Sequence, residues 1–124
     1  LRFRGPLAGV LAALWAAETP YVLTAPCDSP WLPTDYAQRM LVALERERAT
    51  VSVAYGEGCW QPVFALLPVT LQDDLAAWLA VGEGGVGRWL RRHRPARVEF
   101  ADRPMLFRNV NTPEELALLE AVWR

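Results

Sequence analysis

One aspartate occupies a position at which a carboxylate could bind a metal ion. Asp28 follows the apolar run Tyr21–Ala25 and lies in the middle of the turn Pro26–Pro30, which reads Pro-Cys-Asp-Ser-Pro. Mg²⁺ takes oxygen ligands and usually keeps water molecules and substrate phosphates as its other ligands. The alternative is an Asx-turn, in which the Asp28 side chain bonds its own backbone two residues on. The pentapeptide by itself leaves both interpretations open.

Two amide side chains near the other end of the chain could reach a common ligand. Asn109 and Asn111 flank Val110, directly ahead of Thr112. Alternating residues after a strand point to one face, so both amides could contact the same molecule. The alternative is that they close a turn and satisfy backbone groups.

Three further features favour structural roles. Gly82, Gly84 and Gly87 spell G-x-G-x-x-G, but they follow a helical pattern instead of a strand, which predicts a helix–helix connection and not a cofactor loop. The arginines between Arg88 and Arg97 are typical of a solvated face, although phosphate or an acidic partner surface stays possible. His93, the single histidine, is expected to be a solvated helix-end residue.

Composition excludes several classes of protein. The chain has 124 residues, of which 52% are hydrophobic and 22% charged, so it predicts one folded domain. A net charge of −1 argues against nucleic-acid binding, and no apolar run reaches the roughly 18 residues of a membrane span. All 13 basic residues are arginine, so these residues hold no P-loop lysine. Cys27 and Cys59 are expected to be the reduced thiols of a cytoplasmic protein.

Periodicity and turn residues predict alternating helices and strands. Helices are expected from Pro6 to about Glu18, from Pro33 or Thr34 onward, after a Thr70 cap, from Val86 to Leu90 with an end at Arg91 and Arg92, and from Thr112 to the end. The second of these helices is predicted by an apolar stripe, which consists of Tyr36, Ala37, Met40, Leu41 and Leu44. Strands are expected at Tyr21–Ala25, buried and parallel, at Val51–Tyr55 and Pro62–Leu67, paired across a loose loop, and at Arg97–Phe100. This alternation predicts a layered α/β sheet, in which ligands bind beyond the carboxyl ends of the strands, where Asp28 would lie.

Four segments, in this order, resemble one known family. Arg4–Gly9 looks like its G-P-L-A-G segment, Pro26–Pro30 like its P-C-D-x-P metal turn, and Asn109–Leu116 like its N-V-N-T-P-E-[DE]-L signature. Pro62–Leu66 fits the stretch between them. Over nearly its whole length the chain is similar to the MobA family, the molybdenum cofactor guanylyltransferases.

The resemblance implies a fold, an enzyme activity and a set of site residues. The fold would be a three-layer Rossmann-like nucleotidyltransferase sheet, mostly parallel. The reaction would transfer GMP from GTP to Mo-molybdopterin, giving the guanine dinucleotide cofactor and pyrophosphate, with Mg²⁺ as cofactor. Asp28 would be the catalytic residue that binds nucleotide and metal. Gly5 and Gly9 would line the nucleotide cleft, and Asn109 and Asn111 would lie near the pterin substrate.

The resemblance also implies partners and a location. GTP and Mo-molybdopterin would be the substrates, and other molybdenum cofactor biosynthesis proteins and apo-molybdoenzymes are possible partners. Neither nucleic acid nor a membrane is expected, and the location would be the cytoplasm.

One departure from the family pattern shapes these expectations. The family begins with a glycine-rich loop and a lysine that contacts triphosphate, and neither is present in these 124 residues. Residues 1–124 are therefore expected to form a single domain, the C-terminal portion of such an enzyme, whose sheet lacks its first strands and which is inactive alone. The alternatives are the cytidylyltransferase that shares this fold, and a truncated non-catalytic fragment or interaction module.

Overall fold

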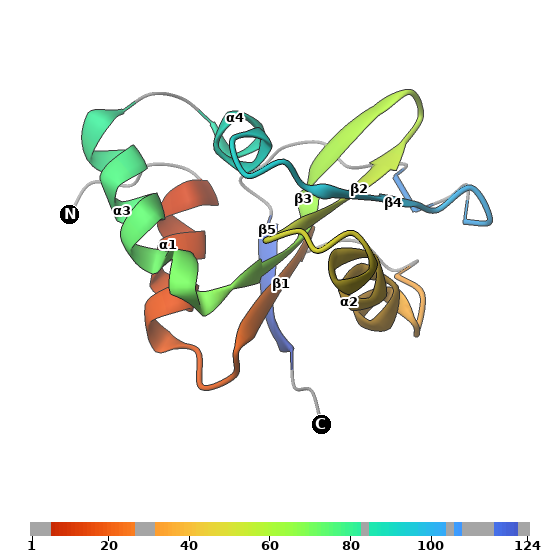
Figure 1. The fold of residues 1–124 in the computed structure, drawn as a ribbon, viewed down its shortest axis with the longest axis horizontal. Helices are drawn as coiled ribbons and strands as arrows, with labels where there is room; N and C mark the ends of the chain where they lie inside the picture. Colours follow the sequence, from red (N-terminus) through yellow and green to blue (C-terminus); the bar gives the residue numbers. More distant parts are fainter. Residues whose placement is uncertain (1–5, 27–31, 83–84, 104–105, 108–115, 122–124) are drawn as a thin grey trace.

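Strands and helices alternate along the chain and build one mixed sheet with helices on both faces (Figure 1). The structure is a computed structural model that describes residues 6–26, 32–82, 85–103, 106–107 and 116–121. The helices are α1 (Pro6–Ala16), α2 (Tyr36–Arg46), α3 (Gln72–Val81) and α4 (Val86–Arg91), and a 3₁₀ turn, η1, covers Val69–Leu71. The strands are β1 (Tyr21–Pro26), β2 (Ser52–Gly56), β3 (Cys59–Pro68), β4 (Ala96–Glu99) and β5 (Leu116–Ala121).

The order of the strands corrects the expectation of a mostly parallel sheet. The order is β4-β2-β3-β1-β5, and only the β2–β4 pair is parallel among the described pairings. The physical reason is the β2–β3 hairpin, because a short turn can join only antiparallel strands. β3 therefore lies between β2 and β1 and runs opposite to both. β1 was expected to be parallel to its neighbours, but it is antiparallel to both β3 and β5.

The hairpin turn is tighter than the loose loop that the sequence predicts. Gly56 pairs with Cys59, so the loop consists of Glu57 and Gly58 alone. These two residues have φ angles of 53° and 82°, and positive φ at both central positions is the geometry of a type I′ turn. β3 consequently begins at Cys59, three residues before the expected Pro62.

The helix predicted from Thr112 to the end is wrong over the part that the structure describes. Residues Leu116–Ala121 form β5 and pair antiparallel with β1 over the latter's six residues. The N–H and C=O groups along an open strand edge need partners, and this pairing supplies them along β1, which outweighs the helical spacing of the apolar residues. The predicted start of that helix lies outside the described residues.

The predicted Thr70 cap is also wrong. Thr70 lies within the 3₁₀ turn that runs directly into α3, and the cap position of α3 is Leu71, which makes no side-chain cap hydrogen bond. The backbone N–H of Gln72 donates to the Val69 carbonyl instead. A continuing turn therefore satisfies the first donors of α3, so no hydroxyl is needed there.

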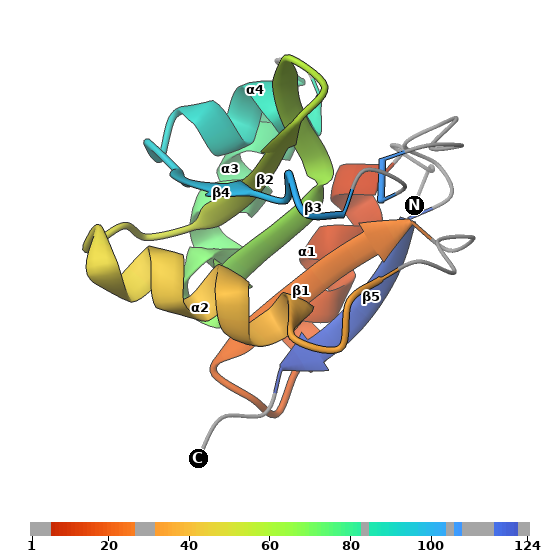
Figure 2. The same ribbon diagram turned by 90° about the vertical axis from the view of Figure 1, so that its right-hand side faces the viewer.

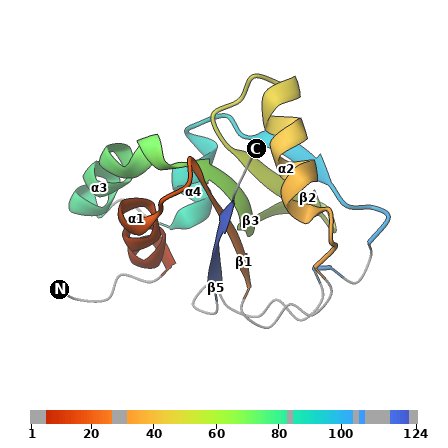
Figure 3. The ribbon, with the colours of Figure 1, turned by 90° about the horizontal axis from the view of Figure 1, so that it is seen from below.

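Two hydrophobic cores lie on opposite faces of the sheet. Helix α2 covers one face, and α1, α3 and α4 cover the other (Figures 2 and 3). Alternation along β3 supplies both cores: Phe64 and Leu66 pack in the α2 core, whereas Ala65 and Leu67 pack in the opposite one. Three layers result, as the sequence predicts.

In α2, the expected apolar stripe is confirmed, because Tyr36, Met40 and Leu44 are buried. The short helix predicted at Val86–Leu90 is confirmed as α4.

Among the described residues, no helix combines the length and the apolar character that crossing a bilayer requires.

Candidate active site at the carboxyl edge of the sheet

Three strands that run in the same direction end at one edge of the sheet. β2 and β4 are parallel, and β1 shares their direction because β3 is antiparallel to both β1 and β2. The carboxyl ends of these strands are Pro26, Gly56 and Glu99. Ligands of open α/β sheets bind beyond such ends, so this edge, called here the carboxyl edge, is the candidate site.

The end of β1 is tied to β3 by a side chain. The β1–β3 ladder stops at the pair Leu23–Leu66. Beyond it, the Thr24 hydroxyl accepts a hydrogen bond from the Ala65 N–H at 3.0 Å and donates one to the Val63 carbonyl at 2.9 Å. Thr24 is 2% exposed, so these bonds are formed out of water. The hydroxyl thus extends the tie between the strands toward the carboxyl edge.

The first residue of α2 is tied to the same place. The Tyr36 hydroxyl donates a 2.7 Å hydrogen bond to the Thr24 carbonyl. Burial raises the pKa of Tyr36 well above its usual value, so the phenol stays protonated and remains a donor. Both flanks of the segment that carries Asp28 are therefore held against β3 and each other.

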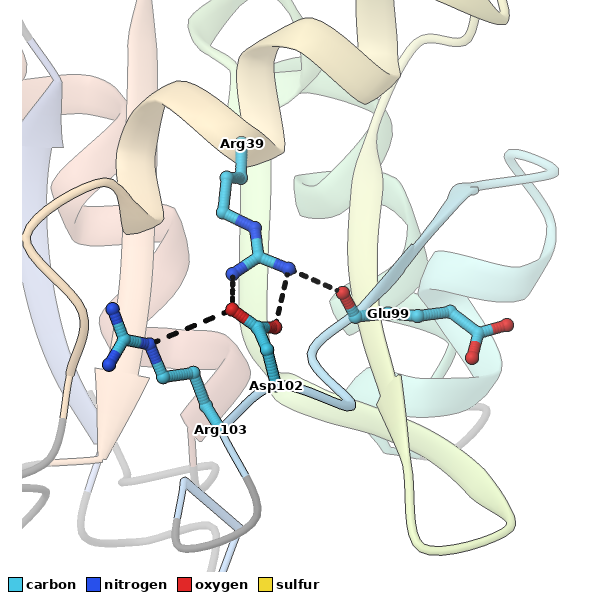
Figure 4. Close-up of polar contacts among 4 residues, drawn as sticks. All are labelled: Arg39, Glu99, Asp102 and Arg103. Carbon is cyan, nitrogen blue, oxygen red and sulfur yellow. Dashed lines mark hydrogen bonds and ion pairs between the residues drawn. The ribbon is translucent and has the colours of Figure 1, made fainter.

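The end of β4 is clamped to α2 by one arginine (Figure 4). Arg39 donates from Nη1 to Asp102 Oδ2 at 3.2 Å and from Nη2 to Asp102 Oδ1 at 3.0 Å. Its Nη2 also donates to the Glu99 carbonyl at 2.8 Å, and its guanidinium lies 4.1 Å from the Phe100 ring centroid. The hydrogen bonds from Arg39 lower the pKa of Asp102 against a smaller opposing effect of desolvation. Asp102 is thus held as a carboxylate.

A cluster of aromatic rings anchors the chain that follows β4. Phe107 lies edge-to-face with Phe64 at a centroid distance of 5.1 Å and with Phe100 at 6.4 Å. Tyr36 joins the cluster through contacts with both Phe64 and Phe100. Phe107 also packs so closely on Gly56 that a Cβ there would overlap its ring. The ends of β2 and β4 are therefore held together by packing.

A cavity of about 340 Å³ opens between the ends of β2 and β4. Its wall is formed by Tyr55, Gly56, Glu57, Gly58, Glu99, Phe100, Ala101, Arg103 and Phe107. On Tyr55, the Arg97 guanidinium lies 3.5 Å from the ring centroid. Aromatic side chains beside Arg103 are suited to a planar ring that carries an anionic group.

Two further cavities are found among the described residues. One, of about 400 Å³, runs along α2 beside β4, and its wall includes Arg39, Arg46 and Glu99, so it reaches the end of β4 alone. The other, of about 260 Å³, lies between the start of β3 and α4 and includes Cys59 and Arg91. Neither combines the ends of two co-directional strands, so the carboxyl edge remains the candidate.

Of the site residues predicted from the sequence, the structure describes Gly9 alone, which lies in α1. Gly5, Asp28, Asn109 and Asn111 lie outside the described residues. The sequence reasoning missed Arg39 and Asp102. A signal existed for Asp102, because it follows the predicted strand Arg97–Phe100 just as Asp28 follows Tyr21–Ala25.

The described residues do not by themselves fit a magnesium ion. Within the ranges that the structure describes, no three His, Cys, Asp or Glu side chains gather around one point. Both carboxylate oxygens of Asp102 accept hydrogen bonds from Arg39. The metal-binding role predicted for Asp28 stays a prediction, because Asp28 lies outside the described residues.

The glycine motif has the structural role that was expected of it. Gly82 ends α3 with a left-handed φ of 74°, and Gly87 lies inside α4. A left-handed C-terminal residue is where glycine is favoured, so the described part of the motif connects two helices.

His93 and two arginines of the predicted solvated face make contacts with other side chains. His93 Nε2 lies 2.9 Å from Asp74 Oδ2, and the His93 side chain is only 17% exposed, which corrects the expectation of a solvated residue. Arg92 lies over the Trp78 ring, at 5.1 Å from its centroid, and Arg97 lies over Tyr55. Two of the arginines therefore pack on aromatic rings.

Known proteins match both the sequence and the fold. Residues 2–98 match the family described as MobA-like NTP transferase domain. A molybdenum cofactor guanylyltransferase of Shewanella amazonensis is 45% identical over 117 residues, covering 94% of this chain and 60% of its own length. One of Burkholderia vietnamiensis is 47% identical over 124 residues, covering 96% of this chain and again 60% of its own. The chain thus spans about 60% of the length of these relatives.

Two solved structures share the fold. A protein of Aquifex aeolicus superimposes with a TM-score of 0.72 at 21% identity, covering 90% of this chain and 59% of its own. Molybdopterin-guanine dinucleotide biosynthesis protein A of Archaeoglobus fulgidus superimposes with a TM-score of 0.66 at 19% identity, covering 90% and 58%. Both share the α/β fold of this chain. The match over residues 2–98 shows that the chain belongs to the family of MobA-like NTP transferase domains.

Proposed function

We propose that this chain takes part in the transfer of GMP from GTP to Mo-molybdopterin, which forms molybdopterin guanine dinucleotide and pyrophosphate. The observation that carries the proposal is the identity of 45–47% with proteins named molybdenum cofactor guanylyltransferase over 94–96% of this chain. The family match and the shared fold support the same class of reaction.

The proposed reaction makes and breaks one bond at the same phosphorus. An oxygen of the acceptor's terminal phosphate attacks the α-phosphorus of GTP, and the bond from that phosphorus to the oxygen bridging to the β-phosphate breaks. Pyrophosphate leaves with the electron pair. Such a transfer needs little covalent help, because in-line positioning and stabilisation of charge supply most of the catalysis.

Each predicted site residue has a role in this proposal. Asp28 would hold Mg²⁺, which when bound offsets the charge of the triphosphate. Gly5 and Gly9 would let the backbone approach the nucleotide closely, and Asn109 and Asn111 would contact the pterin. The described contacts support this arrangement, because Tyr36 fixes the flank of the Asp28 segment to β1.

The proposal includes partners and a location. GTP and Mo-molybdopterin are the proposed substrates, and other molybdenum cofactor biosynthesis proteins and apo-molybdoenzymes are proposed further partners. We place the protein in the cytoplasm, in agreement with the free, exposed thiol of Cys59. The cytidylyltransferase and interaction-module alternatives are not favoured, because the relatives at this identity carry the guanylyltransferase name.

The deciding experiment substitutes Asp28 in the full translation product of the gene. Asp28→Asn keeps the size and the turn-forming ability of the side chain but removes its charge. A lost metal ligand should lower Mg²⁺-dependent pyrophosphate release from GTP and molybdopterin by about a thousandfold, with an unchanged thermal melt.

Two controls complete this test. Asp73→Asn, on an exposed aspartate of α3, should leave turnover unchanged. CTP in place of GTP should give little product. Wild-type turnover in Asp28→Asn would contradict the metal-ligand role, and preferred use of CTP would contradict the guanylyl specificity.

A further inference from the structure

We infer that Arg39 is a positioning residue, which sets one wall of the cavity at the carboxyl edge and thereby the affinity for the acceptor. Asp102 lies between residues of that wall, because Ala101 and Arg103 both line the cavity. A residue that holds Asp102 therefore holds the wall on either side of it. The inference rests on the proposed function, since it assigns the cavity to the molybdopterin substrate.

The hydrogen bonds from Arg39 to Asp102 and to the Glu99 carbonyl, called here the clamp, fix the orientation of the groups that they join. Arg39 reaches two points of the chain, the Asp102 carboxylate through both terminal nitrogens and the Glu99 carbonyl through Nη2 (Figure 4). A bidentate guanidinium–carboxylate pair requires both planes to align, which a lysine ammonium cannot reproduce. The clamp therefore defines a direction for the chain as it leaves β4.

Arg39 connects this wall to the segment that carries Asp28. It lies three residues after Tyr36, so both side chains project from the same face of α2. Tyr36 bonds the end of β1, and its ring lies 5.9 Å from that of Phe100, on which the Arg39 guanidinium rests. One turn of α2 thus holds the ends of β1 and β4 at the same time.

The clamp contributes more to position than to stability. The side chains of Arg39 and Asp102 are 26% and 61% exposed, and exposed ion pairs add little to stability because water screens their attraction. The aromatic cluster beneath them is buried, with Phe100 at 2% exposure, and carries the packing. Loss of the clamp should leave the fold intact while the cavity wall shifts.

The test compares Arg39→Lys, Asp102→Asn and the double variant in the full translation product. Arg39→Lys keeps the positive charge but removes the two guanidinium nitrogens that bind both oxygens of Asp102. A displaced wall should raise both the KM and the Kd for molybdopterin by about tenfold, with KM for GTP and the thermal melt nearly unchanged. The double variant should be no worse than the singles, because all three lose the same interaction. Arg46→Gln, on an exposed arginine of the same helix, is the matched control and should behave as wild type.

The outcomes separate this inference from the proposed function. Unchanged molybdopterin KM and Kd in Arg39→Lys overturn the inference, as does an equal loss for both substrates together with a lowered melting temperature. A wild-type protein that binds molybdopterin but transfers no GMP contradicts the proposed function alone, and the Kd comparison still decides the role of Arg39. A wild-type protein that does not bind molybdopterin overturns both.

Discussion

At the scale of single residues, the carboxyl edge depends on two positions, Gly56 and Thr24, where a small change of side chain disturbs a buried contact. Gly56 at the end of β2 lies directly against the Phe107 ring, which leaves no room for a Cβ. Thr24 at the end of β1 replaces a backbone pairing with its hydroxyl. Both positions predict measurable losses on small substitutions.

Gly56→Ala should destabilise the fold by about 1–3 kcal/mol, because the new methyl group forces the Phe107 ring out of its contacts with Phe64 and Phe100. Urea unfolding at constant m-value measures the loss. Gly85→Ala is the control, since its Cβ would meet no atom within 4 Å. Equal stability of the two variants would show that Phe107 does not pack on Gly56 in solution.

Thr24→Val should cost about 1–3 kcal/mol, because it leaves the buried Ala65 N–H and Val63 carbonyl without their hydroxyl partner. Thr24→Ser keeps the hydroxyl and should retain most of the stability. Chemical denaturation of both variants gives the comparison. If valine and serine were equally tolerated, the hydroxyl bridge would have no energetic role.

At the scale of secondary structure elements, polar side chains connect α3 to α4 and the turn after it. Asp74 in the first turn of α3 accepts a 2.8 Å hydrogen bond from the Trp89 indole and lies 2.9 Å from His93 Nε2. Partial burial acts to raise the pKa of Asp74, but the hydrogen bonds from Trp89 and His93, with the charges of His93 and Arg92, lower it overall. The ionised carboxylate therefore favours the folded state.

This carboxylate predicts a pH-dependent stability. A group whose pKa is lowered by folding stabilises the fold above its unfolded-state pKa, and the effect is lost as the pH falls through the folded-state value. Asp74→Asn should therefore lower stability at pH 7 by about 1 kcal/mol, the cost of weakened hydrogen bonds to a partly exposed charge. The difference from wild type should shrink as the pH falls below the ordinary Asp pKa of 3.8.

Thermal melts across the pH range check this prediction. Asp73→Asn, on the exposed neighbour in the same helical turn, serves as the control and should show no comparable pH dependence. A wild-type advantage over Asp74→Asn that persisted unchanged in acid would contradict the role of the ionised Asp74.

At the scale of the whole molecule, one sheet separates two cores and couples them. Leu66 and Leu67 are neighbours in β3, yet one packs in the α2 core and the other in the core of α1, α3 and α4. Because both cores share the same strands, neither can lose its packing without disturbing the other.

Leu66→Ala and Leu67→Ala should each cost about 2–5 kcal/mol, and each should shift one common transition. Trp78 and Trp89 lie in the α1, α3 and α4 core and Trp60 packs against it, so tryptophan fluorescence is weighted toward that side while circular dichroism reports on all helices. The two signals should coincide in both variants. Separate transitions in Leu66→Ala would show that the faces unfold independently.

Local features of this protein could be predicted from the sequence because they depend on residues close together in the chain. The stripe Tyr36, Met40 and Leu44 predicted α2, and glycines after a helical pattern predicted the connection between α3 and α4. The order of short motifs identified the family, which the match over residues 2–98 confirmed. The rule that ligands bind beyond the carboxyl ends of strands predicts a site beside Asp28, and this stays a prediction.

Only the tertiary structure decided how these elements pair and which side chains meet. The two-residue hairpin places β3 between β2 and β1, and β5 forms where helical spacing predicted a helix, because backbone groups along a strand edge find partners across long stretches of chain. Arg39 and Asp102 are 63 residues apart in the sequence, and no local pattern relates them. Their contact follows from the parallel pairing of β2 with β4 beneath α2, since a side-chain pair of this kind exists only once the sheet has brought two distant elements together.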